Sequence, residues 1–308
     1  MTIVAGFNSG FFLTMVADSR LTGFTQDGKP RTYRDVCQKI FPIGDYALMG
    51  FAGFEEPSGL AMSAVYDRNS REGLSWLLDE SSARQTLEDA LRPCPLVIED
   101  RPICQIMIGF VDPAGLVIEN RARPGTVLIA LACRPFSYRK IMFSFELLGS
   151  GAIIRDDIEK TRAYMDIFNF GDASTELGIR HKTIWTMHVV GGLVERHGIR
   201  TVGGLYQPAY LTPKGWSGVP YRMWVELGKG LGTFVNMKIE QGRWVQEYEP
   251  TGKRVVIGTP FEDDFTFRDL NLNKIFDPRV DLSPDGPGIE KETSPQLVYE
   301  LLGFDSEA

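Results

Sequence analysis

The stretch MTIVAGFNSGFFLTMVADSRLT, residues 1–22, decides how this chain is organised. Two apolar runs, 2–7 and 11–17, are separated by Asn8-Ser9-Gly10, residues typical of tight turns. This pattern predicts two strands joined by a hairpin. A secretory signal would instead carry a basic segment ahead of an unbroken apolar run, and residues 1–7 contain no Lys or Arg.

Further along, blocks of strand alternate with blocks of helix. The polar stretch 23–35 is typical of a loop. Apolar residues at helical offsets predict helices over 56–92, where Ser82 and Gln85 resemble a capping box that opens the second helix. A hairpin is expected around Asp112–Gly115. We expect further strands at about 36–43, 46–52, 103–111, 115–119, 125–133, 141–148 and 205–211, and further helices at 152–168 and 175–196.

This order of blocks is not the βαβα alternation of a doubly wound fold. Strand blocks between helix blocks favour helices packed outside a pair of sheets. We therefore expect an α+β fold over residues 2–212, a four-layer αββα sandwich with two helices on each outer face.

After Leu211 the character of the sequence changes, and a domain boundary is expected near 212–218. The remaining part, 213–308, reads as a C-terminal extension. It is strand-rich to about 257, with Gly-containing turns, and then acidic and loop-rich, with a short helix possible at 295–303. We expect the strand-rich part to pack onto the core.

Composition excludes several classes of protein. The chain has 308 residues, a net charge of −7 and a pI of about 5.2, which argues against a general nucleic-acid binder. Four cysteines without a C-x-x-C pair indicate reduced thiols, and three histidines without an HxxxH or HExxH pattern argue against a zinc site. No run reaches the 18 or so apolar residues of a membrane helix. We expect a soluble cytoplasmic protein without nucleic-acid or membrane partners.

The motifs at the N-terminus, taken in order, resemble those of a known family. They are Thr2-Ile3-Val4, Ala17-Asp18-Ser19-Arg20-Leu21-Thr22, Gln38-Lys39-Ile40, Gly50-Phe51-Ala52-Gly53, Gly109-Phe110-Val111-Asp112, Gly149-Ser150-Gly151 and Gly203-Gly204. This set, over residues 2–212, resembles the catalytic β-subunits of the proteasome and their bacterial relatives. Those proteins are N-terminal nucleophile (Ntn) hydrolases, which share the four-layer αββα sandwich.

The resemblance implies a threonine-type peptidase or amide hydrolase without cofactor or metal. Thr2 would be the nucleophile once Met1 is removed, since a free α-amine, with a pKa near 8, can act as its base. The resemblance further implies that Lys39 lowers the pKa of the Thr2 hydroxyl and that Asp18 binds Lys39. Arg20 supports this pair, Gly53 supplies the oxyanion hole and Ser150 orders the amine.

The same resemblance implies how a substrate would bind. Thr22 would bind an extended peptide backbone, and the first specificity pocket would be lined by Leu21, Cys37, Phe51 and Glu55. Phe51 has an alternative interpretation as an ordinary core residue. The implied partners are a peptide or unfolded-protein substrate and further copies of the chain in a homo-oligomer, with an ATP-dependent unfoldase left open.

The sequence also departs from the family pattern. An Asp and a Ser that the family places just before its Gly-Gly are replaced here by Ile199-Arg200-Thr201-Val202. The segment between Asp18 and Lys39 is five residues longer than usual. Two alternatives to a peptidase therefore stay open: a narrow-specificity amidase or peptide ligase that uses the same acyl-enzyme, and a non-catalytic assembly subunit if Met1 is retained.

Overall fold

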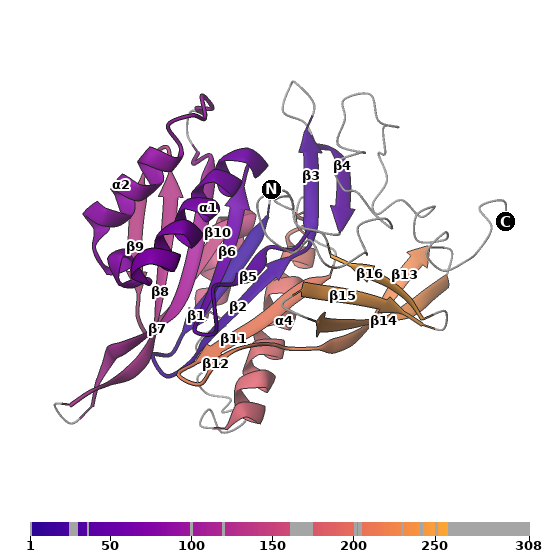
Figure 1. Ribbon diagram of the computed structural model, residues 1–308. Coiled ribbons are helices and arrows are strands. Elements are labelled where there is room, and N and C mark those ends of the chain that lie inside the picture. The colour runs from indigo at the N-terminus through magenta and orange to yellow at the C-terminus, as the bar shows by residue number, and fades with distance from the viewer. Residues whose placement is uncertain are drawn as a thin grey trace.

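The computed structural model describes residues 2–257 except 25–29, 36, 99–100, 119–120, 161–174, 200–201, 203–204, 229–230, 241–242 and 250–251. Two five-stranded antiparallel sheets form its centre (Figure 1). The first sheet has the order β10 (Ser144–Gly149), β1 (Ile3–Asn8), β2 (Leu13–Asp18), β11 (Tyr206–Thr212), β12 (Gly215–Gly218). The second has the order β5 (Ile40–Pro42), β6 (Ala47–Gly53), β7 (Cys104–Ile118), β8 (Arg121–Cys133), β9 (Ser137–Ile141).

The two sheets bury their facing sides against each other. Val4, Leu13 and Met15 of the first sheet share one buried cluster with Leu48 and Met107 of the second. Because both faces of these strands are covered, β2 is buried along its whole length, including its polar residues Thr14 and Asp18. The predicted strands at 2–7 and 11–17 are thus confirmed as β1 and β2, which pair around a turn at Asn8-Ser9-Gly10.

Helices cover the outer sides of these sheets. A second buried cluster holds the side chains of α1 (Glu55–Glu72), the 3-10 helix η1 (Ser75–Leu78) and α2 (Glu80–Ala90) against β6, β7 and β8. A third joins β1 and β10 to the 3-10 helix η2 (Ser150–Ile154) and α4 (Glu176–Arg196). Residues 155–160 are helical too, and the rest of the helix expected to 168 lies outside the described residues.

The extension contributes β12 to the first central sheet and then builds a sheet of its own. Its order is β13 (Tyr221–Gly228), β14 (Leu231–Glu240), β15 (Arg243–Tyr248), β16 (Lys253–Val256), all antiparallel. Val235, Met237 and Trp244 are buried in the cluster that fills the space between the central sheets. The expected strand meander is therefore confirmed, and it packs onto the core. The stretch 258–308, including the helix expected at 295–303, lies outside the described residues.

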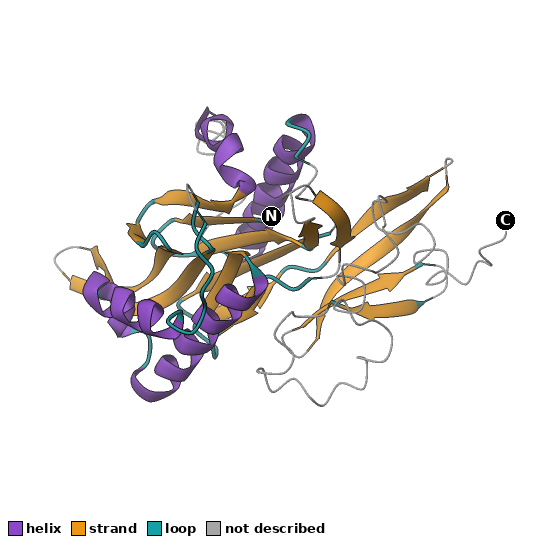
Figure 2. Ribbon diagram, turned by 90° about the horizontal axis from the view of Figure 1, so that it is seen from above, coloured by secondary structure: helices purple, strands orange, loops and turns teal. Residues whose placement is uncertain are grey.

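The predicted fold class is wrong. Among the described residues, antiparallel strands dominate (Figure 2): besides the two central sheets there are a four-stranded sheet and a hairpin, β3 (Arg20–Phe24) with β4 (Pro30–Asp35). The fold is β-rich rather than an αββα sandwich. The order of blocks in a sequence indicates which elements follow one another, but it leaves the number of layers and of sheets undetermined.

Three local predictions also fail, for identifiable reasons. The stretch 23–35 contains strand rather than loop alone, because polar residues can still pair in the β3–β4 hairpin. The helix α2 is capped by Asp79, whose side chain accepts from the Ser82 N–H, and not by Ser82. The strand β7 continues past Asp112–Gly115 with only a register shift, so the turn expected there is an irregularity within a long strand.

Candidate active site

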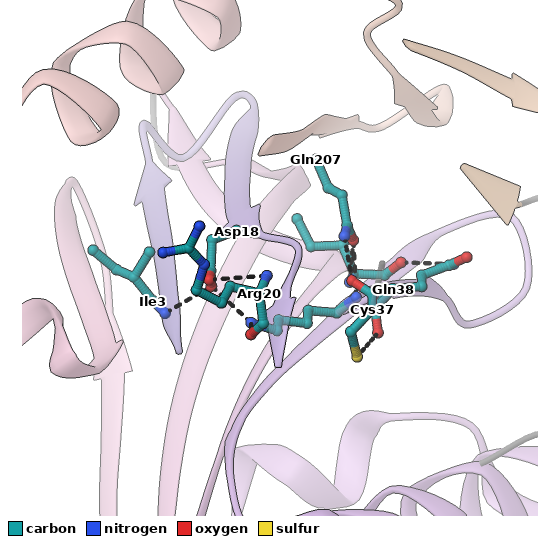
Figure 3. Close-up of polar contacts among 8 residues, drawn as sticks. Ile3, Asp18, Arg20, Cys37, Gln38 and Gln207 are labelled. Carbon is teal, nitrogen blue, oxygen red and sulfur yellow. Dashed lines mark hydrogen bonds and ion pairs between the residues drawn. The ribbon is translucent and has the colours of Figure 1, made fainter. Parts of the chain in front are cut away.

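Asp18, at the end of β2, receives hydrogen bonds from three different segments. Its Oδ1 accepts from the backbone N–H of Ile3 at 3.0 Å and from Lys39 Nζ at 2.9 Å, and its Oδ2 accepts from the Arg20 N–H at 3.2 Å (Figure 3). The side chain is fully buried. A buried carboxylate requires such partners, because an unpaired charge away from water is costly. Asp18 therefore fixes residue 3, and with it the backbone that follows Thr2.

Lys39 is as deeply buried as Asp18. Its ammonium binds the carboxylate of Asp18 and the carbonyl oxygen of Arg20, the latter at 2.5 Å. Both side chains of the ion pair have no exposed surface. Lysine is almost never fully buried in proteins unless it is paired. Through Asp18 the ion pair also holds the N–H of Ile3, the residue that follows Thr2. This position fits either a structural or a catalytic role.

Gln207 on β11 holds the main chain that carries Lys39. Its Oε1 accepts from the N–H groups of Lys39 at 2.8 Å and Ile40 at 3.2 Å, and its Nε2 donates to the Cys37 carbonyl at 2.7 Å (Figure 3). The side chain is fully buried. Gln207 was not predicted from the sequence. A glutamine in the otherwise apolar strand 205–211 was the signal that indicated it.

Thr2 lies where β1, β6 and β10 come together. It is 5% exposed, and its carbonyl oxygen accepts from the Ser150 N–H at 2.8 Å. Gly149 has φ +72, and a Cβ there would lie 1.9 Å from the Thr2 carbonyl oxygen and 3.2 Å from Ala52 Cβ. Only glycine fits between these two residues. The Gly-Ser-Gly turn thus brings the chain directly beside Thr2.

Ser150 contributes a hydroxyl next to Thr2. Its Oγ is buried and has no hydrogen-bond partner among the described residues. Leaving a buried hydroxyl unpaired costs about 1–3 kcal/mol, so such an atom calls for an explanation.

Gly53 follows Ala52 at the end of β6 and is exposed. Its φ is +127, and a Cβ there would lie 2.5 Å from the carbonyl oxygen of Ile103. Ala52 pairs with Gln105, whose Oε1 accepts from the Gly149 N–H at 2.7 Å. These contacts place Gly53 at the same end of the two central sheets as Thr2 and Ser150.

The predicted substrate-binding residues divide into two groups. Cys37 and Phe51 are buried in the helix-covered cluster, where Phe51 packs on Phe41 at 6.2 Å between ring centroids. Glu55 is exposed in the first turn of α1, and its charge acts on Cys37. Leu21 and Thr22 belong to β3, and their side chains lie outside the described part of the structure. Phe51 thus occupies the core position that was its alternative interpretation.

Burial controls the chemistry of Cys37. It raises the pKa of this thiol to about 12, and the positive charge of Lys39 offsets only part of the effect. The thiol is therefore protonated at neutral pH, and its Sγ donates to the Gln38 carbonyl. A thiolate is the reactive form of cysteine, so Cys37 is held in its unreactive form.

Across the described ranges, no group of His, Cys, Asp and Glu is placed to hold a metal ion. No described helix is long and apolar enough to cross a membrane. Of the stretch 199–202, Ile199 and Val202 pack in the buried cluster that contains Val190, Leu193 and Val194 of α4, and residues 200–201 lie outside the description, as do Gly203 and Gly204.

No protein-family model matches this sequence, and the curated proteins include no detectable relative.

Proposed function

We propose that this chain is an N-terminal threonine hydrolase that cleaves peptide or amide bonds through an acyl-enzyme. The observation that carries the proposal is the fully buried Lys39–Asp18 ion pair, bound to the backbone N–H directly after Thr2. The resemblance of the N-terminal motifs to proteasome β-subunits agrees with this chemistry. The proposal depends on the site and does not include the four-layer architecture.

The reaction would proceed in two acyl transfers, once Thr2 is the first residue. The Thr2 hydroxyl attacks the substrate carbonyl carbon while its proton passes to the free α-amine, directly or through water. The ammonium of Lys39 stabilises the developing negative charge on the threonine oxygen. The carbonyl oxygen becomes an oxyanion, for which the Gly53 N–H is the candidate donor. Collapse breaks the C–N bond, and the leaving amine takes the proton.

Water then completes the cycle. It attacks the ester formed on Thr2, passes its proton to the α-amine and releases the carboxylic acid, so that the hydroxyl is restored. In this scheme the Ser150 hydroxyl, which has no hydrogen-bond partner among the described residues, binds and orients the α-amine. Cys37 is held as a neutral thiol and does not take part in this scheme.

The same proposal includes the setting in which the protein works. The four cysteines are all free thiols, which fits the reducing cytoplasm. A homo-oligomer, as in the family that the motifs resemble, would restrict access to the site.

Two substitutions of Thr2 test the proposal. Thr2→Ala removes the attacking oxygen and should abolish peptide-amide hydrolysis and covalent labelling by a β-lactone. Thr2→Ser keeps an oxygen at the same position and should keep part of both activities. If the Thr2→Ala protein is as active as wild type, the nucleophile has been assigned wrongly.

A further inference from the structure

A large cleft adjoins the candidate active site at Arg20. It has a volume of about 780 Å³ and is bounded by α4, the chain that follows it, β11 and the start of β13. Arg20 contributes to its lining and also supplies the backbone groups that bind Asp18 and Lys39. The volume lies within the range of about 300–1,000 Å³ that is usual for small-ligand sites, and it is too small for a folded partner.

The lining of this cleft, called the α4–β13 cleft below, is mostly apolar. It includes Ile184, Met187, Val194, Ile199, Tyr206 and Met223. The charged residues of the lining are Arg20, Glu195 and Arg222, and the guanidinium of Arg222 is bound bidentately by Glu249 and stacks on Phe234. Such a lining favours apolar side chains over charged ones.

Two glycines of α4 create room on the helix side. At Gly191 a Cβ would lie 3.2 Å from the Tyr206 ring, so this residue allows the helix to approach β11. At Gly192 a Cβ would meet nothing within 4 Å, so this position faces the open cleft. The opposite side of the cleft is formed by residues Pro220–Met223 of the extension. The cleft therefore exists only because the extension is folded against the core.

We propose that the α4–β13 cleft is the substrate-binding site of this enzyme and that it takes short peptides or amides with large apolar side chains. The inference rests on the proposed function, since it is the contact with Arg20 that connects the cleft to the reacting groups. The extension then acts as a specificity element, because it closes one side of a cleft that would otherwise be an open face of α4.

Filling the cleft tests this proposal. Gly192→Leu places a bulky side chain in the space, whereas Gly192→Ala adds one methyl group; both should keep the helix, since each residue has a higher helix propensity than glycine. His181→Leu, on an exposed part of α4 outside the cleft lining, is the matched control. Met223→Glu adds a charge to the opposite wall and is a second, independent variant.

The substrate is a trileucyl amide of aminomethylcoumarin, compared with its triaspartyl analogue. We expect wild type to prefer the leucyl amide. The KM for this substrate should rise at least tenfold in Gly192→Leu and in Met223→Glu. It should stay unchanged in Gly192→Ala and His181→Leu. Labelling by a small β-lactone should continue in all four. An unchanged KM in both Gly192→Leu and Met223→Glu, or a preference for the aspartyl amide, would overturn the cleft assignment.

A binding measurement separates this inference from the proposed function. A fluorescein-labelled leucyl peptide should bind the Thr2→Ala protein, followed by anisotropy, and should bind Thr2→Ala/Gly192→Leu at least tenfold more weakly. Equal binding overturns the cleft, whatever the nucleophile is. If wild type is not labelled by the β-lactone, but Gly192→Leu still weakens peptide binding as expected, the proposed hydrolase is wrong. The cleft then remains a peptide-binding site.

Discussion

The side chain of Gln207 on β11 binds the main chain at Lys39, with its Oε1 2.8 Å from the Lys39 backbone nitrogen. Because the same side chain also holds Ile40 and Cys37, it takes the place of a strand partner for this short segment. The position of the Lys39 ammonium thus depends on a residue 168 positions away in the chain. We infer that Gln207 positions the Lys39 ammonium, and a substitution of Gln207 tests this inference.

Gln207→Met should weaken the site without touching substrate. It leaves two buried N–H groups and one carbonyl unpaired, which should destabilise the fold by about 2 kcal/mol or more in urea unfolding. We expect slower β-lactone labelling of Thr2 and a shifted pH profile of the labelling rate, because the ammonium of Lys39 is displaced. Gln246→Met, at a buried glutamine of β15, should cost stability alone; an unshifted profile in Gln207→Met would refute the positioning role.

Two variants distinguish a structural role of the ion pair from the proposed catalytic one. Lys39→Met leaves Asp18 buried without its cation and should cost about 3–5 kcal/mol of unfolding free energy. Adding Asp18→Asn should recover much of this loss, because the remaining buried charge is removed. Labelling of Thr2 should stay slower by about 10²-fold or more in both proteins. Recovery of labelling together with stability would show that the pair is only structural.

Ser150→Ala should leave stability within about 0.5 kcal/mol of wild type, or raise it, because the hydroxyl lost is buried and unpaired among the described residues. If Ser150 orients the free α-amine, the labelling rate should nevertheless fall by about tenfold. Thermal unfolding and labelling kinetics measured on the same sample make the comparison. A loss of stability with unchanged labelling would contradict the assigned role.

Cys37 provides a prediction about pH. Its pKa is raised to about 12 in the fold, above the ordinary thiol value near 9, so the folded state keeps a proton that the unfolded state loses. Its contribution to stability is therefore complete below about pH 9 and is lost as pH rises towards 12. A disulfide reagent at pH 8 should modify Cys37 only after unfolding. Rapid modification of the native protein would show that the thiol is accessible.

The sequence predicts the contact between Asp18 and Lys39, whereas the fold class predicted from it is wrong. Asp18 and Lys39 were assigned together from short motifs, and the ends of strands beside them followed from apolar runs such as 11–17. The layer count was wrong because hairpins with polar residues, such as β3–β4, carry a weak strand signal and because sheet packing is a long-range property. Gln207 was missed for the same reason: its partners lie far away in the chain.

The burial of Phe51 could not have been decided from sequence. An apolar residue at the end of a strand can face a substrate or a helix, and here α1 and α2 cover it. The α4–β13 cleft was equally inaccessible to prediction, since it depends on how the extension folds against α4.

The most direct measurement is the mass of the purified protein before and after reaction with a β-lactone, followed by peptide mapping. We expect the mass of a chain that lacks Met1, and we expect this mass to increase by one β-lactone molecule bound to Thr2. We further expect no adduct in Thr2→Ala. A chain that retains Met1 and takes up no lactone, or an adduct that maps to another residue, would contradict the claim that Thr2 is the nucleophile.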